Sequence, residues 1–428
     1  SLSDNTTGVR NSAFGDNSLA NNTTANNNNA FGYLSLYTNT TGTQNVAIGT
    51  EALTANTTAS NNTAVGYQAG LSNTTGTSNS AIGFQTLQAN TSGSYNSASG
   101  STAMYSNTTG ANNTALGFQS LNANTTAADN TAIGSLCLDA TTTGANNTAV
   151  GRSALTTNTT GYSNTSLGRQ SMYWNTTGYN NTAVGMDASQ SNTDGNSNVA
   201  VGHSSLFSNM GGDNNTAIGL QAGYSVSTGN NNVLIGFQNS SYGTALTTGI
   251  NNTIVGSYSR VSTAGGNYAQ GLGHDLNCEA GYTTVGSSGS DIRAYNGTAT
   301  WATVSDERYK KDIVDSTAGL SFINALQPRT FKYKTLGELP TTFRAYKADS
   351  TEVFKNANTN HGFIAQEVKE AIDADSSIKD GFRLWDDRDD GSQEVAEAAL
   401  IPVLTKAIQE LSAQVTALTA RITELEGE

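Results

Sequence analysis

Small apolar residues recur along the first 240 residues of the chain with a spacing of 17. Each unit contains a five-residue segment such as NTAVG (62–66), NSAIG (79–83) or NTAIG (130–134). In NTAVG the threonine and valine would lie on one face of a strand and the alanine on the other, because successive side chains of a strand point to opposite faces. The pattern therefore predicts one short strand in each unit.

The glycine that ends each segment keeps the repeat in register. It occurs at positions 15, 32, 49, 66, 83, 100, 117, 134, 151, 168, 185, 202, 219 and 236, and the next one, Gly256, follows after 20 residues. A leucine often stands four positions after the glycine and is expected to be buried: Leu53, Leu87, Leu121, Leu155 and Leu206. A unit of 17 residues cannot bury its apolar side alone, so the units must stack.

Many units also contain N-T-T-G, which is expected to form the turn, since asparagine and glycine tolerate positive φ. We predict a mostly β protein, a trimeric parallel β-solenoid or β-roll of 17-residue repeats. With strands about 4.8 Å apart, 14 coils would form a rod of roughly 65 Å. Trimerisation around a shared axis would add burial that small, sparse apolar side chains do not give one chain. A disordered Asn/Thr/Gly-rich segment is the alternative, and the constant register argues against it.

Charge divides the chain into two kinds of polypeptide. Residues 1–300 contain no lysine, 5 arginines and 11 acidic residues, whereas residues 301–428 contain 15 basic and 22 acidic residues. We predict a repeat array at 1–256, an irregular β transition region at 257–304 and a small α+β domain at 305–428. The formal net charge of −13 argues against a nucleic-acid partner.

Metal, cofactor and membrane chemistry find no support in the sequence. The two cysteines, Cys137 and Cys278, show neither disulfide nor zinc spacing, and the three histidines are scattered. No metal site and no cofactor are therefore expected. No run of eighteen apolar residues occurs, so no membrane insertion is expected.

Residues 305–428 have the pattern of a globular domain that ends in a long helix. LSFINAL (320–326) is helical in pattern, TFKYK (330–334) is strand-like, and HGFIAQEVKEAI (361–372) passes from strand to helix. The final helix, at about 396–426, carries a coiled-coil seam with apolar spacings of three and four: Ile401, Leu404, Ile408, Leu411, Val415, Leu418, Ile422 and Leu425. β-branched a positions with leucine at d favour two strands, so a trimer requires the rest of the chain to impose its symmetry.

The repeats resemble a known family. NVAIG (45–49) and NSAIG (79–83) are similar to the head repeats of trimeric autotransporter adhesins, which form parallel β-rolls in homotrimers, and such repeats also occur in phage tail fibres. The resemblance covers about residues 10–260, although the period here is longer than the common adhesin repeat. It implies a homotrimer.

The C-terminal segment resembles the intramolecular chaperone, auto-processing domain of phage endosialidases, tailspikes and tail fibres. The matching stretches are SDERYK (305–310), QPRTFKY (327–333) and HGFIAQEV (361–368), followed by the terminal helix. In that family the serine that opens the motif attacks the peptide bond on its own N-terminal side, and a lysine five residues later acts as the base.

The resemblance implies Ser305 as nucleophile, Lys310 as base, Val304–Ser305 as the scissile bond and an assisting role for His361. The chemistry is reasonable, because a hydroxyl needs a neighbouring base and a lysine can serve if desolvation lowers its pKa. This single-turnover serine–lysine endopeptidase activity is the only enzymatic activity expected. Two alternatives stay open: Ser305 is a helix N-cap, a role compatible with cleavage, and Lys311 is a rival base.

The combined resemblances predict a bacteriophage tail fibre in the virion, assembled in the host cytoplasm. Its expected partners are two further copies of the chain, other virion tail proteins and a host cell-surface receptor. Surface glycans are a candidate receptor because aromatic side chains recur along the repeats: Tyr67, Phe84, Phe118 and Tyr162. The alternative is a bacterial trimeric adhesin head with a non-proteolytic trimerisation domain.

The sequence argues against two other functions of the rod. An ice-binding solenoid needs a flat threonine array, and the Thr-Thr pairs of this repeat are expected in turns. A glycan depolymerase needs paired carboxylates, whereas those of the array are isolated. Asp275 facing Glu279 or Asp291 of a neighbouring chain is the remaining candidate pair.

Overall fold

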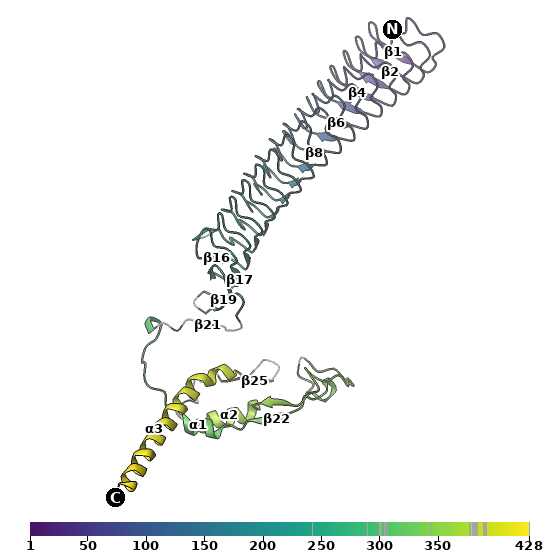
Figure 1. Cartoon of the computed structure of the whole chain (residues 1–428). Coiled ribbons are helices and arrows are strands. Elements are labelled where there is room, and N and C mark those ends of the chain that lie inside the picture. Colours follow the sequence, from purple (N-terminus) through teal and green to yellow (C-terminus); the bar gives the residue numbers. More distant parts are fainter. Residues whose placement is uncertain are drawn as a thin grey trace. The chain divides into compact units, whose positions relative to one another are not determined.

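The computed structural model divides the chain into two compact units, Ser1–Ser305 and Asp306–Glu428. The first unit is built from strands, and the second combines short strands with helices (Figure 1). The structure describes residues 1–241, 243–288, 290–298, 302–303, 305, 307–343, 345–375, 378, 384–387 and 392–427.

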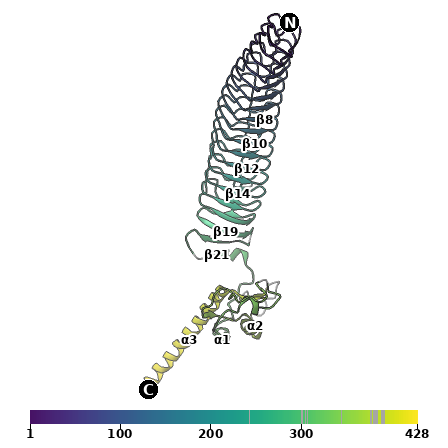
Figure 2. The same ribbon diagram turned by 90° about the vertical axis from the view of Figure 1, so that its right-hand side faces the viewer.

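The first unit is a parallel β-solenoid, and its coils are stacked along one direction in both whole-chain views (Figures 1 and 2). Each strand pairs in parallel with the strand one repeat later, so that Ala47 lies opposite Ala64. The predicted mostly β solenoid of 17-residue coils is thus confirmed. Its regular strands are β1 (Ser12–Phe14), β2 (Asn29–Phe31), β3 (Val46–Ile48), β4 (Thr63–Val65), β5 (Ser80–Ile82), β6 (Ser97–Ser99), β7 (Thr114–Leu116), β8 (Thr131–Ile133), β9 (Thr148–Val150), β10 (Thr165–Leu167), β11 (Thr182–Val184), β12 (Val199–Val201), β13 (Thr216–Ile218) and β14 (Val233–Ile235).

The ladder continues beyond the regular repeats. Val233 pairs with Thr253 across the 20-residue unit, so the extra residues lie in the connection and the sheet register is kept. The region 257–304, expected to be irregular, prolongs the parallel ladder through β17 and β19 and ends in antiparallel β20 and β21. The strands here are β15 (Thr253–Val255), β16 (Arg260–Val261), β17 (Gln270–His274), β18 (Asn277–Cys278), β19 (Tyr282–Ser287), β20 (Ile292–Tyr295) and β21 (Ala302–Thr303).

Alanine and leucine side chains fill the coil interior. From β2 to β9 the central alanine of each strand is at most 3% exposed, and the leucines predicted to be buried, such as Leu53 and Leu121, are at most 3% exposed. The glycine after each strand lies in the left-handed φ region, +140° at Gly117, where an added Cβ would lie 2.5 Å from the carbonyl oxygen of Gly134. Glycine is therefore required for the coils to approach each other this closely.

The asparagine of N-T-T-G does not take the positive φ that was expected of this turn from the sequence. It is buried, and its amide joins successive coils: Asn73 Nδ2 donates to Asn56 Oδ1 at 3.0 Å and to the carbonyl oxygen of Gly76 at 2.9 Å. Other positions take the positive φ, including Leu53 (51°) and Gln68 (56°). The asparagine lies inside because each coil leaves polar backbone groups there that need partners.

A second buried asparagine, the one before each strand, forms a parallel ladder. The backbone N–H of Asn79 donates to Asn62 Oδ1 at 2.9 Å, and Asn79 Nδ2 donates to the carbonyl oxygen of Gly93 at 2.9 Å. This ladder runs from Asn11 to Asn252 and ends at the N–H of Ala269. Most regular coils are therefore joined to the next by a strand and by two asparagine ladders.

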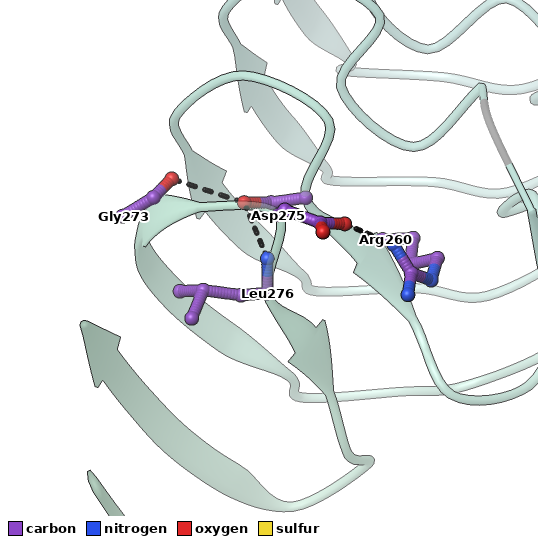
Figure 3. A network of polar contacts seen from close by, with 5 residues as sticks. Arg260, Gly273, Asp275 and Leu276 are labelled. Atoms are coloured by element: carbon purple, nitrogen blue, oxygen red, sulfur yellow. Dashed lines mark hydrogen bonds and ion pairs between the residues drawn. The ribbon is translucent and has the colours of Figure 1, made fainter. Parts of the chain in front are cut away.

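Near the end of the ladder, a serine hydroxyl and an ion pair join successive coils (Figure 3). The Ser259 hydroxyl accepts from the N–H of Leu276 at 3.2 Å and donates to the carbonyl oxygen of Gly273 at 3.0 Å. Beside it Arg260 Nη1 lies 2.6 Å from Asp275 Oδ1, and this hydrogen bond lowers the pKa of Asp275. The last coils are thus joined by the buried hydroxyl of Ser259 and by a partly exposed ion pair.

The second unit contains α1 (Leu320–Ala325), β22 (Arg329–Phe331), β23 (Asn360–Gly362), α2 (Ala365–Ala374), β24 (Trp385–Asp387), β25 (Gln393–Val395), α3 (Leu400–Glu426) and the 3-10 turns η1 (Glu307–Tyr309), η2 (Leu336–Glu338) and η3 (Glu397–Ala399). Its core joins α1, α2 and the start of α3 through Phe322, Val368, Ile372 and Val403, each at most 4% exposed. Glu410 of α3 accepts from the backbone N–H of Leu320 at 2.8 Å and so fixes α1 against α3.

Candidate functional site

The predicted cleavage motif lies at the boundary between the two compact units. Ser305 is the last residue of the first unit, and its side chain is exposed. The 3-10 turn η1 follows, and Lys310 ends it by donating its N–H to the carbonyl oxygen of Glu307 at 2.9 Å. The Lys310 side chain is also exposed. Val304, the other half of the predicted scissile bond, lies outside the described residues.

The structure bears differently on the two alternatives, Ser305 as a helix N-cap and Lys311 as the base. An N-cap role for Ser305 would be followed by a helix, and the described residues after it form only the single turn η1 before an extended stretch. Asp306, part of that capping pattern, lies outside the described residues. Lys311 is exposed, as Lys310 is, so exposure does not separate the two candidate bases.

His361 is held on a different element. It lies on β23, opposite Thr330 of β22, and its side chain is exposed. The neighbouring Arg329 joins β22 to α2 by a bidentate contact with Glu367, with Nη2 2.7 Å from Oε1 and Nε 2.9 Å from Oε2. These hydrogen bonds lower the pKa of Glu367. The strand pair that carries His361 is thereby attached to the helical core.

The eight residues predicted to form the coiled-coil seam lie on α3 and face solvent in the single chain. All eight seam residues are between 42% and 66% exposed. The neighbouring face of the same helix is buried, with Leu400 at 6%, Val403 at 3% and Ala407 at 4% exposed. The helix therefore belongs to the core of the second unit by one face and presents an unpartnered apolar seam by another.

Exposed apolar residues also lie in two columns along the solenoid, which we call the strand face. One column is the third residue of each strand, and the other is the residue after the glycine. Tyr67 and Phe84 of the second column stack with ring centroids 5.5 Å apart. Tyr67, Phe84 and Phe118 stand out singly in the sequence, whereas the face that they share was not predicted. Its signal was the recurrence of valine, isoleucine or leucine on the strand side opposite the buried alanine.

The described residues give little support for a glycan-cleaving, thiol or metal site. Asp275 pairs with Arg260, and Glu279 pairs with Arg293, so two carboxylates considered for glycan cleavage each contact an arginine of their own chain. Cys137 is fully buried, and burial raises the pKa of its thiol to about 12. Within the described part of the chain, no group of three or more His, Cys, Asp or Glu side chains could hold a metal. The helices described there include none with the length and apolarity to cross a membrane.

Comparison with known proteins adds one finding. Residues 305–375 match the model of the peptidase family described as chaperone of endosialidase. No curated protein and no solved structure matches the chain. The chain therefore carries a β-solenoid followed by a segment similar to the chaperone of endosialidase, and the similarity begins at Ser305.

Proposed function

We propose that the chain is a homotrimeric fibre of a bacteriophage tail, whose C-terminal domain assembles the trimer and then cuts itself off between Val304 and Ser305. The observation that carries the proposal is a coincidence of boundaries. The first compact unit ends at Ser305, and the match to the chaperone family begins at the same residue. A cut there separates the solenoid from the assembly domain.

The cleavage step uses groups of this chain and water. Neutral Lys310 takes the proton of Ser305 Oγ, which attacks the carbonyl carbon of Val304. The C–N bond breaks, the α-nitrogen of Ser305 receives the proton, and Val304 is held as an ester on Oγ. Water then hydrolyses the ester to a Val304 carboxylate and the free hydroxyl of Ser305. Because Lys310 is exposed in the single chain, we propose that contact with another chain completes the site around it.

Assembly is a reasonable role for the removed domain. A parallel solenoid made of contacts 17 residues apart gives little local guidance for aligning three chains, and such pairing folds slowly. The exposed seam of α3 can hold three chain ends together and raise their effective concentration. The finished fibre would then present its rod to a host surface receptor as part of the virion.

The test is the intact mass of freshly purified protein. Wild-type protein should give a C-terminal piece that begins at Ser305, and Ser305→Ala and Lys310→Ala should remain uncut. Lys310→Arg should also remain uncut, because it keeps the charge and cannot act as a neutral base. Lys311→Ala is the matched control and should cut normally.

Two results would count against the proposal. Cleavage lost in Lys311→Ala and kept in Lys310→Ala would make Lys311 the base. An uncut wild-type chain would exclude self-cleavage and leave a trimerisation domain without protease activity, as in a bacterial adhesin head.

A further inference from the structure

The strand face is distinguished by its exposed apolar surface. Within residues 29–135, all of which the structure describes, neither of its columns contains a charged residue. Its large members expose 37% to 51% of their surface: Phe31, Tyr33, Ile48, Tyr67, Ile82, Phe84, Leu116, Phe118 and Ile133. At roughly 200 Å² for each large side chain, this amounts to on the order of 800 Å². A typical monomer exposes patches of only about 300–600 Å².

Another side of the same coils is polar. The first threonine of each N-T-T segment donates its hydroxyl to the backbone of the next coil, for example Thr108 Oγ1 to the carbonyl oxygen of Thr125 at 2.9 Å. The second threonine, such as Thr109 or Thr126, is exposed. We call these two columns the threonine face. They expose hydroxyl and methyl groups to solvent and contain no large apolar side chain within residues 29–135. The exposed large apolar side chains of residues 29–135 therefore lie mainly on the strand face, with Tyr95 and Tyr105 as the exceptions.

We propose that the strand face over β2 to β8 is the surface by which three copies of this chain pack, parallel and without axial shift. This inference rests on the proposed trimeric assembly and names the surface that performs it. Each chain would divide this area between its two neighbours, so the trimer would bury on the order of 2,400 Å² of apolar surface in all.

The chemistry of the face fits identical copies better than another occupant. In an unshifted parallel trimer every residue near the axis meets itself, so a charge there would meet two like charges. Uncharged apolar residues avoid that repulsion, and residues 29–135 supply only such residues and small hydroxyl residues on this face. Charges occur in these columns only outside this range, at Asp16, Arg152 and Arg169, and Arg169 lies 3.7 Å from Asp187 of its own chain.

The proposal also changes where a receptor can bind. Tyr67, Phe84 and Phe118 lie on the strand face and would be covered by neighbouring chains, so they would not be available to stack on a glycan. Tyr162 lies outside this face and stacks on Tyr179 with ring centroids 4.9 Å apart. This pair would stay accessible.

Cross-linking the full chain tests the surface directly. Leu116→Cys places a thiol on the strand face, and Thr126→Cys places one on the threonine face of the same coil, both at exposed positions. The native thiols of Cys137 and Cys278 are fully buried and should not react in the folded protein. With a short bis-maleimide, Leu116→Cys should give chains linked in pairs on a denaturing gel, and Thr126→Cys should give single chains.

The mass of the untreated wild-type protein by sedimentation separates this proposal from the one on which it rests. A monomeric mass would overturn the proposed trimer. A trimeric mass without linking through Leu116→Cys, or with linking through Thr126→Cys alone, would leave the trimer standing and overturn the strand face as its interface.

Discussion

Asparagine has two roles in this solenoid, and both depend on its amide. A buried amide donates and accepts at once, so a column of asparagines can join every coil to the next and also satisfy backbone carbonyls. Asn90 Nδ2 shows this by donating to Asn73 Oδ1 at 2.8 Å and to the carbonyl oxygen of Gly93 at 3.0 Å. Where another residue takes the place of asparagine, the column of hydrogen bonds is interrupted. Thr141 and Val226 replace asparagine, and the Oδ1 atoms of Asn124 and Asn209 one coil earlier have no partner.

The ladder can be completed at Thr141. In Thr141→Asn the new amide can donate to Asn124 Oδ1 and to the carbonyl of Gly144, and it can accept from Asn158, which now contacts Thr141 Oγ1 at 3.4 Å. We expect the rod to gain about 1 kcal/mol, since a buried orphan acceptor obtains its hydrogen bond. Thermal unfolding followed by circular dichroism measures the gain. Thr143→Asn on the exposed face is the control and should leave the midpoint unchanged. A lower midpoint for Thr141→Asn would contradict this account.

At the scale of elements, α3 has two apolar faces with different partners. Its buried face packs against α1, where Phe322 is 2% exposed. Its seam, which includes Ile408 and Leu411 at 66% and 50% exposure, has no partner within the described part of the second unit. The two faces can therefore be altered separately, and the seam should control assembly without controlling the fold of the domain.

Leu411→Asp tests this separation. We expect helix content to be kept and the trimeric mass to be lost at micromolar concentration, because three unpaired carboxylates would be buried together in the coiled coil. Circular dichroism and sedimentation measure the two properties. Ala413→Asp, two residues further on and also exposed, lies off the seam and should assemble as wild type. A trimeric Leu411→Asp protein would show that the seam is not needed for assembly.

At the scale of the whole molecule, the two units have opposite physical character. The rod is a nearly uncharged ladder of identical coils, and the C-terminal unit is a charged domain with its own core. Each coil contacts mainly its neighbours, so a coil gives no information about where a second chain should align. Removal of the assembly domain would then leave a rod that persists because unfolding is slow, and that cannot rebuild its trimer once unfolded.

Refolding experiments can compare trimer formation with and without the assembly domain. The uncut Ser305→Ala protein should recover trimeric rods after dilution from denaturant, whereas the purified cleaved rod should recover at least about tenfold fewer, because its chains no longer share a clamp that raises their effective concentration. Size-exclusion chromatography with light scattering gives the two yields. Equal recovery would mean that the rod carries its own registration signal, with the strand face as the first place to look for it.

Local pattern in the sequence was enough to predict the solenoid, its 17-residue coil, its buried leucines and the separate charged domain. Spacing alone specifies these features, since a stacked repeat can bury only positions that recur in every unit. The positions of the seam residues on α3 also follow from spacing, because apolar residues three and four apart lie on one side of a helix. The cleavage residues came from a resemblance, and they stay a prediction.

Features that depend on which way a side chain points were decided only by the tertiary structure. N-T-T-G reads as a turn in isolation, and only the stacked coils show that its asparagine points inward to satisfy backbone groups. The strand face likewise exists only once Phe84 and Leu116, 32 residues apart in sequence, are brought onto one side of the rod. Sequence period determined which residues are equivalent. The path of the backbone between them determined which are buried together and which are left for another chain.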